Sequence, residues 1–251
     1  MSVNVPLSIV VATYARSALL KALIESLTQQ TDMAFEVVVA IDGSPDDTEA
    51  MLEAYRSQSP FEIRWLNTNM VDAYGLATAR NAGIKAARGT AVVILDDDSI
   101  PVPEFVAEHK ATVTVRTLTG GARISTETTD NLAEKNRLYL EIFGDSCPGA
   151  IVSIRGHGSI VENNTCMFKS DWLGSGLFDE SIQWYGGIGQ NFMHRLQSAG
   201  YQYQFNPRAA IIHQAEYRRN HLYPKAPASG RKSVMRRLWN RLRRTKTLSE
   251  R

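Results

Sequence analysis

Residues 91–98 read AVVILDDD, a run of apolar residues followed at once by three aspartates. A short run of this kind, rich in β-branched residues, is typical of a strand that is buried on both faces of a sheet. Residues 7–13 (LSIVVAT) and 36–41 (EVVVAI) have the same character, and residues 63–66 predict a shorter strand. The spacing of these four runs leaves room for a helix between each strand and the next.

The intervening segments carry apolar residues at helical spacing. The first holds Leu19, Leu20, Leu23, Ile24 and Leu27. Residues 51–55 indicate a second helix, which Asp46 or Asp47 could cap, and residues 75–88 predict a third that ends at a Gly89 cap. Alternating strands and helices predict βαβ units, so the expected fold class is α/β with a mostly parallel sheet.

The pattern is less regular after Pro103. Helices are predicted at residues 105–111, 132–143 and 190–199, and strands at 113–118, 201–205 and 209–213. No internal repeat or long linker interrupts the chain before residue 218, so residues 1–217 are expected to form one domain.

Polar residues end or follow three of the predicted strands, at Thr13, at Asp42 and at Asp96–Asp98. Because open α/β sheets bind ligands at the carboxyl ends of their strands, we expect these residues to share one edge. Strand alternation would turn Asp96 and Asp98 to one side and Asp97 to the other. Paired carboxylates favour Mg²⁺ or Mn²⁺, which also bind phosphates. A solvated acidic loop or a set of helix-capping aspartates is the alternative.

Several segments share their order and spacing with one enzyme family. They are SIVVATYAR (8–16), VVVAIDGSPDDT (37–48), ATARNAGIKAARG (77–89), VVILDDDS (92–99), LFDESIQWYGG (177–187) and HRLQSAGYQYQFNPRAAIIH (194–213). The ordered set resembles the GT-A glycosyltransferases of family 2, over roughly residues 5–213. The resemblance implies a GT-A fold, which is a Rossmann-like, mostly parallel central sheet flanked by helices.

The resemblance also implies roles for individual residues. The residues expected to bind the nucleotide are Thr13, Arg16, Asp42, Arg80, Asp96 and Asp97, and those expected to hold Mn²⁺ or Mg²⁺ are Asp98 and His213. Structural roles are the alternatives for three of these residues. Asp42 could stabilise a turn, and Arg80 could make a salt bridge on a helix surface. His213 could have a purely structural role at the end of a strand.

A general base is the part of the family pattern that the sequence lacks. The family spacing places a Glu-Asp pair at Ile188 and Gly189, neither of which can accept a proton. The neighbouring amides, Gln190 and Asn191, are weak candidates. Carboxylate or imidazole candidates on nearby loops are Asp179, Glu180, Glu162 and His157. The alternatives are a site that binds nucleotide without transfer, or a different alignment in this region.

Charge is divided unevenly along the chain. Residues 218–251 contain twelve Lys or Arg and one acid, whereas residues 1–217 contain sixteen basic and twenty-five acidic residues. Within this tail, SVMRRLWNRLRR (233–244) predicts a basic amphipathic helix, and residues 231–246 are expected to contact an anionic membrane surface. A helix packed on the body or a disordered tail is the alternative. Nucleic-acid binding is disfavoured because no recognised module accompanies the charge.

Cys147 and Cys166 are expected to be reduced thiols. With no signal peptide and no apolar stretch of about 18 to 20 residues, we expect a cytoplasmic protein, peripheral on a membrane if the tail binds lipid.

The resemblance implies metal-dependent transfer of a sugar from a nucleotide-sugar, with a UDP-sugar favoured, to a glycan, lipid or small-molecule acceptor. A degenerate sugar-nucleotide-binding or scaffold protein is the alternative, and a nucleotidyltransferase is a minor one.

Overall fold

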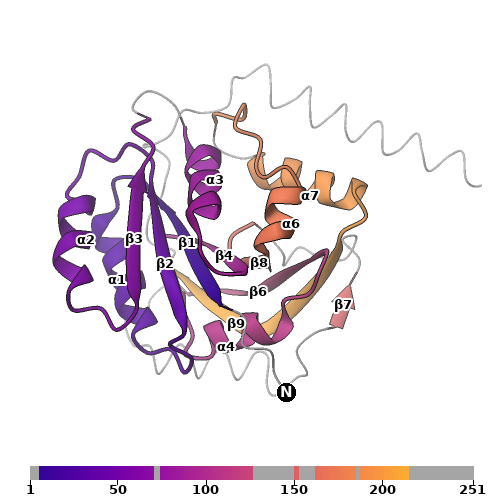
Figure 1. Cartoon of the computed structure of the whole chain (residues 1–251), viewed down its shortest axis with the longest axis horizontal. Helices are drawn as coiled ribbons and strands as arrows, with labels where there is room; N and C mark the ends of the chain where they lie inside the picture. Colours follow the sequence, from indigo (N-terminus) through magenta and orange to yellow (C-terminus); the bar gives the residue numbers. More distant parts are fainter. Residues whose placement is uncertain (1–5, 71–73, 127–149, 153–161, 185–186, 215–251) are drawn as a thin grey trace, which may run out of the picture.

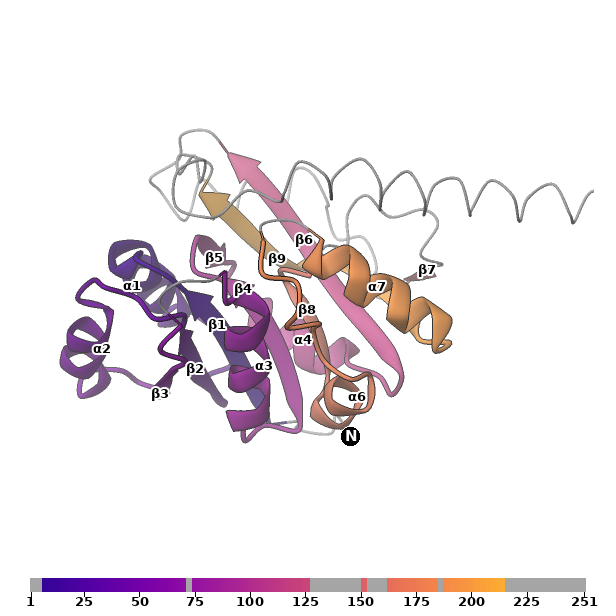
Figure 2. The same ribbon diagram turned by 90° about the horizontal axis from the view of Figure 1, so that it is seen from above.

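The computed structural model describes residues 6–70, 74–126, 150–152, 162–184 and 187–214. These residues form one nine-stranded sheet with helices on both faces, as Figures 1 and 2 show. The strand order is β3-β2-β1-β4-β8-β6-β9-β5, and β7 pairs with β9. The predicted α/β class is confirmed.

The first half of the sheet is parallel and confirms the four strands predicted from the sequence. They are β1 (Leu7–Thr13), β2 (Phe35–Ile41), β3 (Glu62–Asn67) and β4 (Ala91–Asp96). The helices between them are α1 (Ser17–Leu27), α2 (Thr48–Arg56) and α3 (Leu76–Ala86). Ala12 lies opposite Asp96, and Thr13 lies opposite Ile41. The predicted gathering of strand ends at one edge is therefore correct.

The second half of the sheet is mixed. Strand β8 (Thr165–Phe168) is antiparallel to both β4 and β6 (Thr117–Thr126), and β6 is parallel to β9 (Gln202–Gln214). The short strands β5 (Ser99–Pro101) and β7 (Ala150–Val152) are antiparallel to β9. The longest ladders are parallel, as expected. Because Ser99 pairs with His213, strand β5 joins the acidic turn to the end of β9.

Alternate strand residues face two apolar layers. Val11 belongs to the layer under α1, α2 and α4 (Phe105–Thr112), together with Leu23 and Phe105. Val10 belongs to the layer under α3, α6 (Lys169–Gly174) and α7 (Ile188–Ser198), where Trp172 stacks on Phe192 at 5.2 Å between ring centroids. Packing on both faces fixes the sheet edge from which the polar residues project.

Several local predictions are wrong. The strands predicted at 201–205 and 209–213 are one strand, in which residues 207–210 bulge between the pairs Gly121–Asn206 and Arg123–Ile211. The strand predicted from Val113 begins at Thr117, because Val113 N–H still bonds the last turn of α4. Helix α3 ends at Ala86 without using Gly89 as a cap, and α6 was not predicted.

Some sequence-based predictions concern residues outside the described ranges. They are the helix at 132–143, Cys147, His157 and the tail at 218–251. Cys166 is described and is a buried free thiol. None of the helices within the described ranges combines the length and the apolar character needed to cross a lipid bilayer.

Candidate nucleotide and metal site

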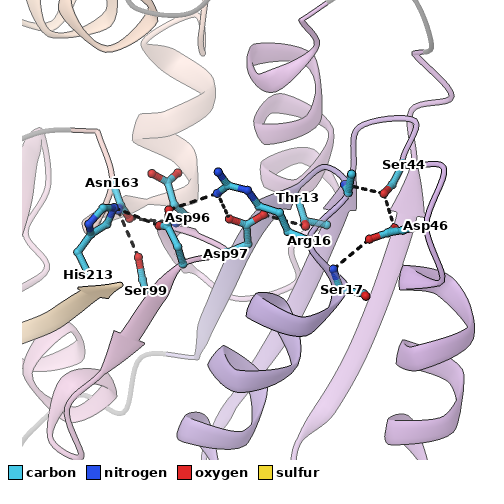
Figure 3. Close-up of polar contacts among 12 residues, drawn as sticks. Thr13, Arg16, Ser17, Ser44, Asp46, Asp96, Asp97, Ser99, Asn163 and His213 are labelled. Atoms are coloured by element: carbon cyan, nitrogen blue, oxygen red, sulfur yellow. Dashed lines mark hydrogen bonds and ion pairs between the residues drawn. The ribbon is translucent and has the colours of Figure 1, made fainter. Parts of the chain in front are cut away.

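The acidic turn after β4 is held by the loop that follows β1. Thr13 Oγ1 donates a hydrogen bond to Asp97 Oδ2 at 2.9 Å, and Arg16 Nη1 donates to Asp97 Oδ1 at 2.8 Å (Figure 3). The same Nη1 also donates to Asp98 Oδ2 at 3.2 Å. Because β4 ends at Asp96, strand alternation does not extend to the next two residues. The predicted separation of Asp97 from Asp98 is therefore wrong, since one guanidinium contacts both.

Burial strengthens this ionic cluster. The side chains of Arg16, Asp97 and Asp98 are at most 5% exposed. Burial raises the pKa of Asp97 to about 6, because the positive charge of Arg16 offsets only part of the desolvation and Asp98 adds repulsion. Two buried, ionised carboxylates without a cation would be strongly destabilising. The positive charge of Arg16 therefore stabilises the turn when Asp97 and Asp98 are ionised.

Backbone contacts on either side of Arg16 hold it in position. Ala15 N donates to Ser44 Oγ at 2.7 Å, and Ser17 N donates to Asp46 Oδ2 at 3.0 Å (Figure 3). Asp46 also accepts from Thr48 N at 3.3 Å, whereas the N-cap of α2 is Asp47, whose side chain makes no capping hydrogen bond. The loop after β1 is thereby tied to the loop after β2, and both loops position the guanidinium.

His213 lies beside the acidic turn (Figure 3). Its Nε2 is 3.4 Å from Asp98 Oδ1. Within the described ranges, no three His, Cys, Asp or Glu side chains are grouped to hold a metal by themselves. However, Mg²⁺ and Mn²⁺ are commonly held by one or two carboxylates together with substrate phosphates, and imidazole is a ligand of transition metals. The donor set of Asp98 and His213 therefore fits Mn²⁺ when phosphates supply further oxygens.

Asp42 lies at the carboxyl end of β2, on the other side of β1. Its Oδ2 accepts a hydrogen bond from Gly75 N at 3.0 Å. The nearby Thr68 hydroxyl donates its hydrogen bond to Ile41 O. Asp42 Oδ1 is buried and has no hydrogen-bond donor among the described residues. A Cβ at Gly75 would overlap this oxygen. Burial raises the pKa of Asp42 to about 6 in spite of the Gly75 N–H. A buried acceptor of this kind is suited to a ligand N–H.

The raised pKa of Asp42 predicts a pH-dependent effect on stability. The folded state takes up the proton more readily than the unfolded state, so the wild type loses stability as pH rises through about 6. Asp42→Asn removes the charge and should stabilise the fold at pH 8 by about 1–3 kcal/mol, with about 2–4 °C in Tm for each kcal/mol. The advantage should shrink between pH 6 and about pH 4 and vanish below it. Thermal unfolding at pH 8 and pH 4 tests this, and an equal Tm difference at both values would contradict it.

Arg80 is supplied by α3 and is 1% exposed. Its Nη2 donates to Asp96 Oδ1 at 2.7 Å, and its Nη1 lies 3.7 Å from Glu162 Oε1. Burial by itself would lower the pKa of Arg80, but the carboxylates of Asp96 and Glu162 raise it overall. The alternative of a salt bridge on a helix surface is therefore wrong. Arg80 lies next to the acidic cluster, as the resemblance implied.

A pocket opens between Asp42 and the acidic turn. It is lined by Ala12, Thr13, Tyr14, Arg16, Asp42, Tyr74, Leu76, Asp96 and Asp97. The lining contains five of the six predicted nucleotide-binding residues, and Arg80 contacts one of them, Asp96. The pocket also has aromatic and apolar walls, which come from three residues that were not predicted from the sequence: Tyr14, Tyr74 and Leu76. Such walls suit the flat face of a base.

The family is decided by a match that covers most of this framework. Residues 8–168, which is more than half of the chain, match the family model described as Glycosyl transferase family 2. The chain belongs to glycosyltransferase family 2. This family 2 chain is 27% identical over 224 residues to the hyaluronan synthase of Pasteurella multocida, covering 77% of this chain and 23% of that protein. It spans about a quarter to a third of the first curated relatives that it matches.

Two solved structures show the same fold. S. aureus TarS 1–349 in complex with UDP-GlcNAc gives a TM-score of 0.62 at 19% identity, covering 84% of this chain and 59% of that one. GalNAc-T7 with UDP, GalNAc and Mn²⁺ gives a TM-score of 0.63 at 15% identity, covering 84% and 44%. Likeness at these identities establishes the shared architecture, and the predicted GT-A fold is confirmed.

The two positions at which the resemblance predicted a Glu-Asp pair, Ile188 and Gly189, carry residues that cannot accept a proton. Ile188 and Gly189 form the buried first turn of α7. Gln190 is exposed, and Asn191 Oδ1 accepts a hydrogen bond from Arg195 Nε at 2.9 Å within the same helix. None of these four residues of α7 supplies a carboxylate or an imidazole, so a base for the reaction has to come from another element.

The other candidate carboxylates on this side make structural contacts. Asp179 Oδ1 accepts hydrogen bonds from Ser181 N at 3.0 Å and Ser181 Oγ at 2.6 Å, and these bonds lower the pKa of Asp179. Glu180 accepts from Asn81 Nδ2 at 2.8 Å and Thr78 Oγ1 at 3.1 Å, which ties its loop to α3. His157 lies outside the described residues.

Asn163 is a site residue that sequence reasoning missed. Its Oδ1 accepts a hydrogen bond from Asp96 N at 3.0 Å, and its Nδ2 donates to Ser99 Oγ at 3.3 Å (Figure 3). Asn163 thus holds the acidic turn at both ends. The only sequence signal is a short polar run, ENNT, directly before the apolar residues of β8. Nothing in that run indicates that its partner lies 67 residues earlier in the chain.

Proposed function

We propose that this domain transfers a sugar from a nucleoside diphosphate sugar, with a UDP-sugar favoured, to an acceptor hydroxyl. The observation that carries the proposal is the placement of a buried carboxylate acceptor and a metal-type donor pair on one sheet edge. Asp42 lines the pocket, and Asp98, which pairs with Arg16, lies beside His213. Family 2 membership supports the same reaction class.

Recognition of the base would involve Asp42. Uracil presents an imide N–H, and a buried carboxylate oxygen without a donor is a suitable partner for it. Tyr14, Tyr74 and Leu76 supply walls on which a base can pack. Guanine also presents ring and exocyclic N–H donors, whereas cytosine lacks a ring N–H. Asp42→Asn is therefore expected to weaken UDP binding by about tenfold or more, since a hydrogen bond to a charged group is worth about 1.5–3 kcal/mol.

The diphosphate would lie towards Asp98 and His213, and these two side chains would hold Mn²⁺ or Mg²⁺. A divalent cation bound there neutralises charge on the leaving diphosphate. Arg16 keeps Asp98 in place, and Arg80 with Asn163 orients Asp96 at the pocket wall. TarS was crystallised with UDP-GlcNAc and GalNAc-T7 with UDP and Mn²⁺, and these complexes support the choice of donor and metal.

A panel of donors tests the proposal. The purified full chain is incubated with UDP-, GDP- and CDP-sugars and MnCl₂, and released nucleotide and sugar products are followed by mass spectrometry. Hydrolysis or transfer from a UDP-sugar, absent with EDTA, is the expected result. Consumption of a GDP-sugar alone would revise the donor, and no consumption of any donor together with no UDP binding would overturn the proposal.

Tight UDP binding without turnover would instead favour the second candidate, a sugar-nucleotide-binding protein. The observation in its favour is the base-less first turn of α7, at Ile188 and Gly189. The acceptor would be a glycan, a lipid or a small molecule. Residues 231–246, whose sequence is basic and amphipathic, would bring the domain to an acceptor near a membrane surface.

A further inference from the structure

We propose that Glu162 is the general base that deprotonates the acceptor hydroxyl. This inference rests on the transferase function proposed above. It assigns to a residue before β8 a task that the first turn of α7 cannot perform. Glu162 is partly exposed, at 29% of its side chain, and lies next to Asn163, which holds the acidic turn.

The decisive contact is between Glu162 and Gly189. A Cβ built on Gly189 would overlap the carboxylate of Glu162. The carboxylate therefore occupies the space into which a side chain at residue 189 would project. Residue 189 is one of the two positions at which the resemblance predicts the missing pair. A carboxylate is thus present at this place, delivered by a different element of the fold.

Positive charge lies beside the Glu162 carboxylate. Arg80 Nη1 lies 3.7 Å from its Oε1, and Arg80 also bonds Asp96 at the pocket wall. The first turn of α7, an eleven-residue helix, presents its positive dipole end beside it. The Arg80 guanidinium therefore contacts both the Glu162 carboxylate and Asp96, which lines the pocket.

The other carboxylates near this edge are held more firmly. Asp97 and Asp98 bond Arg16, Asp96 bonds Arg80 at 2.7 Å, and Asp42 bonds Gly75 N. The separation between Glu162 and Arg80 exceeds hydrogen-bond length. Unlike these four carboxylates, Glu162 combines partial exposure with a loose ionic contact, which leaves an oxygen able to receive a proton.

The step balances as a single displacement. The acceptor oxygen forms a bond to the anomeric carbon, and the bond from that carbon to the β-phosphate oxygen breaks. The leaving nucleoside diphosphate takes the electron pair of the broken bond. The acceptor proton passes to Glu162, which returns it to water after the products leave. Inversion at the anomeric carbon follows from the in-line attack.

Glu162→Gln tests the assignment with UDP-GlcNAc, Mn²⁺ and either water or azide as the acceptor. Turnover with water should fall by about 10² to 10⁴. Azide has no proton to lose, so formation of the glycosyl azide should be nearly unchanged, and UDP affinity measured by calorimetry should also be unchanged. Equal loss with both acceptors, or wild-type turnover with water, would overturn the assignment of the base.

Gly189→Ala gives an independent test because it leaves the carboxylate in the protein but displaces it. It should lower turnover with water and spare UDP affinity. The matched control is Gly174→Ala, where an added Cβ meets only Tyr201 Oη, at 3.8 Å. If the wild type binds UDP but turns over none of the donor panel with either acceptor, the transferase function itself fails. A Glu162→Gln variant that equals an active wild type rejects only the base.

Discussion

Asp98→Asn should abolish the Mn²⁺-dependent part of UDP binding. Asp98 is the carboxylate that faces His213, at 3.4 Å, and its other oxygen accepts from Arg16 at 3.2 Å. An amide at this position keeps an acceptor for Arg16 but loses the negative charge that a hard cation requires. Removing a residue that only hydrogen-bonds a metal ligand already costs about 10- to 100-fold in metal affinity, so removing a ligand itself should cost at least about 100-fold.

Calorimetric titration of UDP with MnCl₂ or with EDTA measures this effect. The wild type should bind far more tightly with Mn²⁺, and Asp98→Asn should bind equally weakly in both. His213→Ala should change affinity in the same direction. Asp32→Asn is the control, because Asp32 pairs with Lys110 at 2.9 Å outside the site. Full Mn²⁺ dependence in Asp98→Asn would exclude Asp98 as a ligand.

The strands that build the site edge could be predicted because each is a continuous apolar run. Burial on both faces of a parallel sheet requires such runs, so β1, β2 and β4 are visible as LSIVVAT, EVVVAI and AVVIL. Thr13, Asp42 and Asp96 follow from them, because parallel strands bring their carboxyl ends to one edge. The pocket lining contains all three residues.

Contacts between distant segments could not be predicted in the same way. Asp97 and Asp98 share Arg16 because the strand ends one residue before them, and strand periodicity does not reveal where a strand ends. The contact between Glu162 and Gly189 depends on how β8 and α7 pack, and a glycine carries no sign of the side chain that fills its space. For that reason the sequence around position 189 does not reveal that a carboxylate lies there.

Arg16→Ala should destabilise the fold by about 3–5 kcal/mol, because it removes the cation shared by two buried carboxylates. Such a loss is a large part of the total stability of a typical domain, about 5–15 kcal/mol. Urea unfolding in EDTA measures it without a contribution from bound metal. Arg88→Ala is the matched control, since Arg88 pairs with Glu62 at 2.7 Å but is 64% exposed. Exposed ion pairs contribute about 0–1 kcal/mol, so this variant should remain near the wild type.

The physical cause can be separated from lost packing by a second substitution. Asp97→Asn in the Arg16→Ala background removes one of the buried charges that Arg16 compensates, while an amide oxygen can still accept the hydrogen bond from Thr13 Oγ1. If unpaired charge is the cause, the double variant should be more stable than Arg16→Ala alone by about 1–3 kcal/mol. In the wild-type background, Asp97→Asn should not stabilise to this extent, because Arg16 is still present to pair with Asp97. Purely additive effects of the two substitutions would mean that Arg16 stabilises the turn by packing its side chain, and not through its charge.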